Sequence, residues 1–262
     1  MNLYDGTGTR IPVGGDGSTK IPWLNLSHKG AAADAYGNSV YAFNKTQEYG
    51  MDGTELDIRM TADNVVVLSH DADVTGTDSG GTSRTLTIIS STYAELSALT
   101  LFTIDGVGYH LIRLDDLARM AFYWNWKMIQ LDAKSQANTS QCIVKASEII
   151  RDNGLCGRAT YFSAASVVSE VLANDPYANF TVGATGAIGS EFADIPVYRI
   201  WRSVNRSVLS TFVRDEHPFY VSDATASYAD MIMARQPDGI QWQADTDGRS
   251  LSETYLANVD WD

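Results

Sequence analysis

The sequence predicts an α/β protein folded as a (β/α)8 barrel, and two observations support this prediction. Short apolar runs of strand length alternate with stretches of helical spacing from residue 20 onward, and there are eight such runs. Strands that alternate with helices favour a parallel sheet joined by right-handed crossovers. Eight such units in roughly 240 residues fit a closed barrel, and an open doubly wound sheet is the second interpretation.

The expected elements can be taken in order along the chain. CIVKASEIIRDNG has apolar residues near helical spacing and ends at Gly154, while SVVSEVLAND offers Ser166 as an N-cap. RSVLSTFVRDE and ASYADMIMARQ also have helical patterns. The eight expected barrel strands are KIPWLNLSHKG, GTELDIRM, KMIQLDAKS, ATYFSA, FTVGATG, IPVYRIW, PFYVSDA and GIQWQAD.

The chain is expected to contain one barrel domain over residues 20–262. Residues 1–19 are rich in Gly, Thr and Asp without periodicity, which indicates a leader or linker. An insertion at about residues 60–112 follows the second strand and contains VVVLSHD and the polar DVTGTDSGGTSRTLT. A long, loop-rich insertion is expected to shape a site rather than to build a core.

Composition excludes some classes of protein. The net charge of −13 argues against a broad nucleic-acid surface, which needs clustered Lys and Arg. The chain has no apolar run of eighteen residues and no secretory signal, so we expect a soluble protein without a transmembrane segment. The sequence does not determine the location of the protein. An extracellular location, or a place within a larger phage or surface protein, stays open. Cys142 and Cys156 are expected to be structural.

Charged side chains stand two positions apart on two of the expected strands. Glu55 and Asp57 therefore share one face of GTELDIRM, and Asp132 and Lys134 share one face at the end of KMIQLDAKS. Three carboxylates at one barrel mouth would suit Mg²⁺ or Ca²⁺, with Lys134 near an anionic oxygen. The alternatives are a solvated strand edge and a simple ion pair between Asp132 and Lys134.

Histidine is scarce, and two of the four histidines end expected strands. His28 closes LNLSH and His70 closes VVVLSH. Imidazole exchanges protons near neutral pH, so this pair beside a carboxylate cluster suits general acid–base chemistry. His110 and His217 have no such neighbours and are expected to be structural or on the surface.

Together these motifs resemble a known family. SHKG, then Asn38 and Ser39, then GTELDIRMTADNVVVLSHD and LDAK resemble the glycerophosphodiester phosphodiesterase family of phosphatidylinositol-phospholipase-C-like TIM barrels. The family pattern is His-Arg-Gly, Asn-Thr, Glu-x-Asp, His-Asp and Glu-x-Lys, in this order. The match extends from residue 28 to residue 134 and is weak in the rest of the chain.

The resemblance implies a role for each matching residue. His28 and His70 would be the acid–base pair. Lys29, where the family usually has Arg, would contact phosphate together with Lys134. Tyr220, in YVSD, would take the place of an aromatic wall. The implied ligands of a divalent cation, Mg²⁺ or Ca²⁺, are Glu55, Asp57 and Asp132, the last standing where Glu is usual.

The implied function is metal-dependent hydrolysis of a glycerophosphodiester by histidine acid–base catalysis. The substrate would be a small molecule or a glycerol-phosphate polymer such as teichoic acid, and both a direct and a cyclic-phosphate route stay open. A noncatalytic polymer-binding barrel of a phage or extracellular protein is the second interpretation. A phosphoinositide-cleaving lipase is the third interpretation. Exposed apolar residues on the rim would favour such a lipase, whereas the insertion at this rim is polar.

Overall fold

A computed structural model describes residues 25–32, 36–162 and 164–181 in full. It also describes the backbone of residue 24, of residues 182–183 and of the other strands named below. Two of these, β1 (Asn2–Tyr4) and β2 (Arg10–Pro12), pair antiparallel within the expected leader. His217 and the helices expected from RSVLSTFVRDE and ASYADMIMARQ lie outside the described residues.

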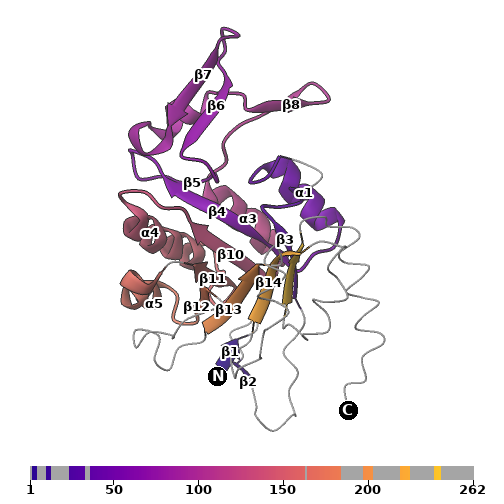
Figure 1. Ribbon diagram of the computed structural model, residues 1–262, viewed down its shortest axis with the longest axis vertical. Helices are drawn as coiled ribbons and strands as arrows, with labels where there is room; N and C mark the ends of the chain where they lie inside the picture. The colour runs from indigo at the N-terminus through magenta and orange to yellow at the C-terminus, as the bar shows by residue number, and fades with distance from the viewer. Residues whose placement is uncertain are drawn as a thin grey trace.

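Eight of the described strands form the barrel, and all eight correspond to the expected apolar runs. Each strand pairs in parallel with two neighbours, and β15 pairs with β3, so the pairing runs around a complete ring. Figure 1 shows these strands side by side. They are β3 (Leu24–His28), β4 (Gly53–Met60), β10 (Met128–Ala133), β11 (Ala159–Phe162), β12 (Asn179–Gly183), β13 (Val197–Arg202), β14 (Phe219–Ala224) and β15 (Gly239–Trp242).

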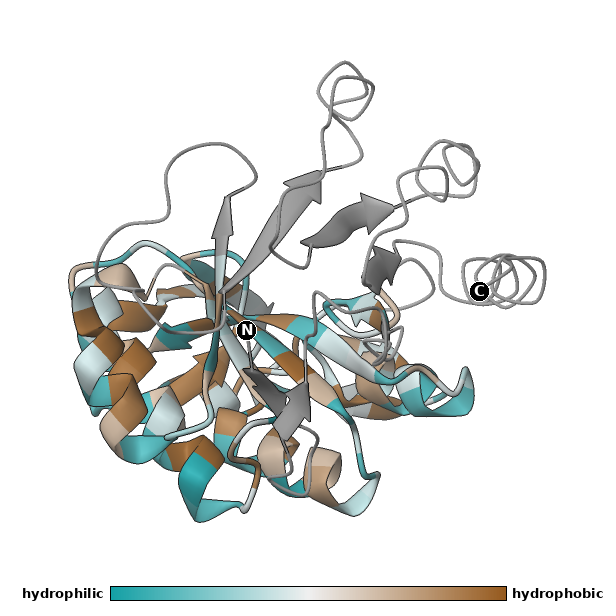
Figure 2. Cartoon of the chain, turned by 90° about the horizontal axis from the view of Figure 1, so that it is seen from below, coloured by the Kyte–Doolittle hydropathy of each residue, from teal (hydrophilic) through white to brown (hydrophobic). Residues whose placement is uncertain are grey.

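Amphipathic helices cover the outer side of the first strands. They are α1 (Val40–Glu48), α3 (Leu114–Tyr123), α4 (Thr139–Asp152) and α5 (Val168–Asn174). In α3 the buried residues Leu114, Leu117, Ala118 and Ala121 recur at helical spacing and join the main core. Figure 2 shows hydrophobic and hydrophilic residues in bands along the described helices. None of the described helices is both long and apolar enough to cross a membrane.

The predicted cap of α5 is wrong. Ser166 lies inside the 3-10 turn η2 (Ala165–Val167), and Val167 precedes the helix without a side-chain cap. The Ser166 hydroxyl lies 3.2 Å from the hydroxyl of Ser140 on α4 instead. The additional turn moves the start of the α-helix past the residue whose type favoured capping.

The segment between β4 and α3 builds more structure than its sequence predicted. It contains β5 (Val66–Leu68), the hairpin β6 (Asp73–Thr77) and β7 (Ser83–Thr87), η1 (Ile88–Ser90), α2 (Tyr93–Ser97) and the hairpin β8 (Phe102–Ile104) and β9 (Val107–Tyr109). Figure 1 shows β6, β7 and β8 beyond one end of the barrel strands. Contrary to expectation, this segment has a small core of its own, formed by Val67, Val74, Ile88, Leu96, Leu99 and Leu111.

Candidate active site

Three carboxylates meet on the neighbouring strands β4 and β10, near the carboxyl end of β10. Asp132 on β10 stands in register with Asp57 on the parallel strand β4. Leu56 and Ile58, the alternate residues of β4, join the hydrophobic core on the other face. Glu55, Asp57 and Asp132 each place a carboxylate oxygen within 4.8 Å of the other two. The sequence prediction that these three side chains converge is therefore confirmed geometrically.

Burial and repulsion make this cluster electrostatically unusual. Glu55 is 4% exposed and Asp57 is fully buried. Burial, and then repulsion from Asp57 and Asp132, raise the pKa of Glu55 well above its usual value. Burial alone would also raise the pKa of Asp57, but hydrogen bonding and attraction from Lys134, with attraction from Lys29, hold it below its usual value.

Two ammonium groups contact the cluster, one from the turn that follows β3 and one from the residue that follows β10. The Lys134 Nζ lies 2.7 Å from both Asp57 Oδ1 and Asp132 Oδ2. The Lys29 Nζ lies 3.3 Å from Asp57 Oδ2. Both lysines are half-buried, with side chains about one-fifth exposed. Asp57 therefore contacts both Lys29 and Lys134, the two residues predicted to bind phosphate.

The turn after β3 places Lys29 at the cluster. Lys29 and Gly30 both have positive φ, 57° and 74°, a conformation that favours glycine. A Cβ on Gly30 would approach the Ala42 Cβ to 2.8 Å, so glycine is also required sterically. The turn directs the Lys29 backbone N–H to Glu55 Oε2, at 3.2 Å. The SHKG motif thus contributes a backbone donor and an ammonium.

The two histidines reach the site differently. His28 ends β3 as predicted, and its Nε2 lies 3.7 Å from Glu55 Oε2. The prediction that His70 ends a strand is wrong, because β5 stops at Leu68 and His70 lies in the loop beyond it. The His70 ring is about half exposed, and its Nδ1 lies 2.8 Å from Asp71 Oδ1.

Two residues that sequence reasoning did not assign hold this arrangement together. Asn38 donates from Nδ2 to Asp57 Oδ2 at 2.7 Å and accepts from the Asp57 N–H at 3.1 Å. Arg59, which is 8% exposed, donates from Nε and Nη2 to the His70 carbonyl and from Nη1 to the Ser135 carbonyl. Asn38 stands in the quoted motif, whereas nothing in the sequence pattern singled out Arg59.

The other residues considered in the sequence analysis do not contact the three acids or have side chains outside the described residues. Tyr220 is on β14, but its side chain lies outside the described residues. The His110 Nδ1 lies 2.9 Å from the Leu99 carbonyl, and His110 also lines the cavity that contains His70. Cys142 is buried, which raises its thiol pKa to about 12, and it forms no disulfide with Cys156.

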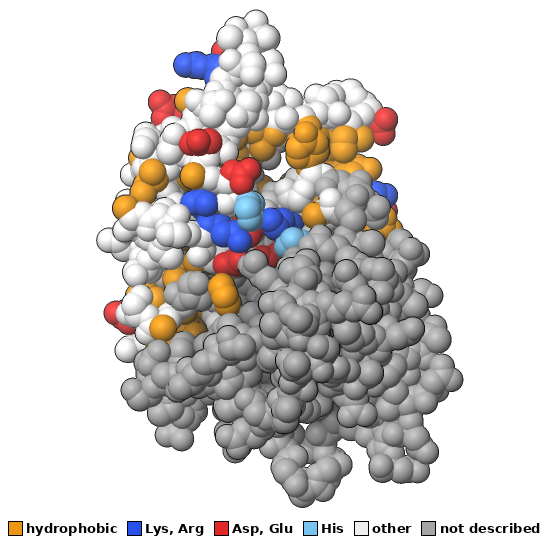
Figure 3. Space-filling view, in the orientation of Figure 1, with side chains coloured by type: hydrophobic (Ala, Val, Ile, Leu, Met, Phe, Trp, Pro, Cys, Tyr) orange, Lys and Arg blue, Asp and Glu red, His pale blue; other side chains and the backbone are white. Residues whose placement is uncertain are grey.

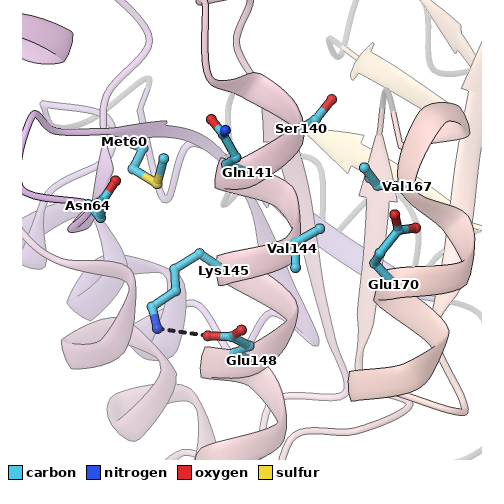
Figure 4. Close-up of a pocket in the computed structure, with 9 residues that line it drawn as sticks. All are labelled: Met60, Asn64, Ser140, Gln141, Val144, Lys145, Glu148, Val167 and Glu170. Carbon is cyan, nitrogen blue, oxygen red and sulfur yellow. Dashed lines mark hydrogen bonds and ion pairs between the residues drawn. The ribbon is translucent and has the colours of Figure 1, made fainter.

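A cavity of about 640 Å³ opens beside the cluster, lined by Lys29, Asn38 and His70 among others. Figure 3 shows acidic, basic and histidine side chains gathered on this face, next to a patch of hydrophobic side chains. Another cavity, of about 500 Å³, lies over α4 on the outer side of the barrel, and Figure 4 shows the Lys145–Glu148 ion pair along it. It is lined by no histidine and by no residue that contacts the acidic cluster. Lys29 and Asn38 in the first cavity both contact Asp57, and His70 lines it as well, so the first cavity is the candidate active site.

The fold and the site define the class: a (β/α)8 barrel with a carboxylate cluster that could hold a cation at the carboxyl ends of its strands. Residues 28–154 match the model of the glycerophosphoryl diester phosphodiesterase family. A glycerophosphodiester phosphodiesterase from Caldanaerobacter subterraneus subsp. tengcongensis is 37% identical over 57 residues, which span 22% of this chain and 24% of that relative. The resemblance seen in the sequence is thus confirmed: this part of the chain matches that family.

Solved structures show the same fold across most of the chain. A protein from Silicibacter pomeroyi described as a glycerophosphoryl diester phosphodiesterase aligns with a TM-score of 0.71 and 17% identity, over 92% of this chain and 96% of its own. A glycerophosphodiester phosphodiesterase from Parabacteroides distasonis aligns at 0.69 and 18%, over 92% and 100%. A phosphodiesterase from Oleispira antarctica, in complex with the product sn-glycerol-3-phosphate, aligns at 0.66 and 16%, over 89% and 97%.

Proposed function

We propose that this chain hydrolyses glycerophosphodiesters, and that residues 20–262 act as one barrel domain with an insertion at about residues 60–112. The observation that carries the proposal is the meeting of three carboxylates, two ammonium groups and His28 where β3 and β10 pair with β4. The name of the Caldanaerobacter relative and the glycerol phosphate in the Oleispira structure support a glycerol-phosphate substrate.

Glu55, Asp57 and Asp132 would hold a divalent cation, Mg²⁺ or Ca²⁺. Their oxygens are the donors that hard cations prefer. Burial, and then repulsion from Asp57 and Asp132, raise the pKa of Glu55, so a bound cation would favour its ionised form. When bound, the cation would offset negative charge that builds up on the phosphate during hydrolysis. Asp132 already contacts Lys134, so cation binding would compete with this ion pair.

The lysines complete the charge balance. With all three carboxylates ionised, the cluster and the ammonium groups of Lys29 and Lys134 would sum to one net negative charge, which would repel an anionic substrate. A dication reverses this to one net positive charge, which complements the single charge of a phosphodiester. Lys29 and Lys134 would then contact the phosphate oxygens, and Tyr220 is proposed as a further substrate contact.

His28 and His70 would exchange protons with the reacting oxygens. One imidazole takes the proton of the attacking hydroxyl, and the other protonates the leaving alkoxide, which is otherwise a poor leaving group. A proton on Nδ1 of His70, donated to Asp71, leaves its Nε2 lone pair available for this exchange. Arg59 holds the His70 backbone, and so positions the ring without touching it.

The test is hydrolysis of glycerophosphodiesters with added Mg²⁺, Ca²⁺ or Mn²⁺. We expect turnover, and a chelator should abolish it reversibly. His28→Ala and His70→Ala should each abolish turnover while divalent-cation binding persists. Cation binding serves as the folding control for both variants. Unchanged turnover in both variants would refute the acid–base assignment, and no turnover with any substrate would favour the noncatalytic barrel.

A further inference from the structure

The candidate active-site cavity extends beyond the reacting groups into an aromatic wall. Lys29, Asn38 and His70 line it, and the first two contact Asp57, so we call this the inner part. Tyr36 and Phe102 also line the cavity, and we call their part the outer part because Tyr36 is exposed. A phosphate held near the inner groups would leave one alcohol of the diester to occupy the outer part. The side chains of that outer part would therefore contact the alcohol.

The wall is a stack of rings from two segments of the chain. The rings of Tyr36 and Phe102 lie parallel with centroids 4.2 Å apart, and those of Phe102 and Tyr109 lie parallel at 4.8 Å. Both faces of Phe102 are thus covered, whereas Tyr36 is 63% exposed. The stack joins the loop after β3 to the β8–β9 hairpin, so the ring of Phe102 supports the exposed ring of Tyr36.

The cavity carries charges of both signs. It is lined by the ammonium-bearing Lys29 and by two carboxylates, Asp71 and Asp73. Asp71 contacts His70, but among the described residues the exposed Asp73 forms no ion pair. A cavity that offers both a carboxylate and an electron-rich ring attracts an organic cation, whereas a neutral polyol gains nothing from the charge.

We propose that this outer subsite selects glycerophosphodiesters whose alcohol carries a positively charged nitrogen, such as a quaternary or primary ammonium alcohol. Tyr36 would contact the cation through its ring, and Asp73 would supply the opposing charge. The zwitterionic substrate then matches the cavity along its length, with phosphate toward Lys29 and ammonium toward Asp73. This inference rests on the proposed function and names the substrate class for the same site.

The experiment compares kcat/KM for glycerophosphocholine and glycerophosphoethanolamine with kcat/KM for glycerophosphoglycerol and glycerophosphoinositol. We expect the cationic esters to be favoured about tenfold or more, equivalent to about 1.4 kcal/mol. Asp73→Asn and Tyr36→Leu should remove this preference by lowering only the values for the cationic esters. A general folding defect would lower all four values together.

Matched controls carry the same chemical changes outside the cavity. Asp105→Asn removes one charge from the turn of the β8–β9 hairpin, and Asn tolerates its φ of 50°. Tyr123→Leu removes a ring that is 87% exposed at the end of α3. Both controls should keep the preference of the unchanged protein.

Equal kcat/KM for all four esters would overturn the inference about the subsite but not the proposed function. A preference that survives Asp73→Asn and Tyr36→Leu would do the same. If none of the esters is cleaved, the proposed function fails, and calorimetry then tests the subsite independently. Tighter binding of glycerophosphocholine than of glycerophosphoglycerol by the unchanged protein would support it. Equal binding would overturn it.

Discussion

Asn38 holds Asp57 by two hydrogen bonds, one to its carboxylate and one from its backbone N–H. Asp57 in turn contacts both lysines, so Asn38 fixes the residue at the centre of the cluster. Asn38→Ala should weaken divalent-cation binding by about 10- to 100-fold, as loss of a group that orients a ligand typically does. Titration calorimetry with Mn²⁺ or Mg²⁺ measures the change.

Asn64→Ala is the control for this substitution. Asn64 is an exposed asparagine with φ of 61°, close to the 58° of Asn38, so its replacement brings similar backbone strain without touching the cluster. It should lower stability slightly and leave cation affinity unchanged. Equal losses of cation affinity in the two variants would show that strain, and not the contact to Asp57, is responsible.

Arg59→Lys should lower kcat more than it lowers cation affinity. Arg59 donates three hydrogen bonds to the carbonyls of His70 and Ser135, and a single ammonium cannot reproduce that planar fork. The loop that carries His70 would lose its anchor, so we expect at least about a tenfold fall in kcat. Steady-state kinetics at saturating cation, with calorimetry alongside, separates the two effects.

Arg113→Lys provides the comparison for Arg59→Lys. Arg113 forms a similar two-pronged contact, with Asp116 on α3, but does not contact His70 or the acids. It should leave kcat near that of the unchanged protein. If Arg113→Lys slowed turnover as much as Arg59→Lys, the positioning role of Arg59 would be wrong.

Cation binding should release protons and strengthen as pH rises. The pKa of Glu55 is raised mainly by burial, so this carboxyl retains its proton above its usual range while the cation needs the ionised form. Below the raised pKa, protons compete with the cation, and above it the competition ends. Calorimetry in two buffers of different ionisation enthalpy counts the protons released, and Glu55→Gln should abolish the release. A pH-independent affinity would contradict this account.

Asp175 should make the folded state less stable as pH rises from about 4 to 6. Burial raises its pKa to about 6, although its Oδ1 accepts from the N–H groups of Gly157 and Tyr177. The folded state therefore holds this proton more tightly than the unfolded chain, whose carboxyl ionises near pH 4. The contribution of Asp175 to the free energy of unfolding is therefore largest below pH 4. It is about 3 kcal/mol smaller once pH exceeds 6.

Asp175→Asn removes this dependence and keeps an oxygen that can accept both N–H groups. The free energy of unfolding of the variant, minus that of the unchanged protein, should grow between pH 4 and 6 and then level off. Urea unfolding at a series of pH values measures it, with the exposed Asp105→Asn as control. A flat difference would show that Asp175 ionises alike in both states.

The barrel and its acidic cluster were predictable because their signals are local. An apolar run is needed for each buried strand, and the alternation of Glu55 with Asp57 on β4 determines their shared face. Parallel pairing then brings Asp132 beside Asp57. These three side chains therefore follow from strand geometry once the fold class is known.

Features that depend on contacts between distant segments were not predictable in the same way. Arg59 matters because two separate loops place their carbonyls around one guanidinium, and backbone carbonyls have no signature in the sequence. His70 lies beyond its strand because the pairing of β5 with β4 ends at Leu68. The small core under the insertion likewise comes from single apolar residues scattered among polar ones.

The pairing of β15 with β3 has a consequence for shortened forms of this protein. Ser27, next to His28, stands in register with Trp242 on the last strand. A chain cut before residue 239 would leave the backbone groups along one side of β3 unpaired, which is a template for self-association. We therefore expect such truncations to aggregate, although the acidic cluster lies entirely upstream of the cut.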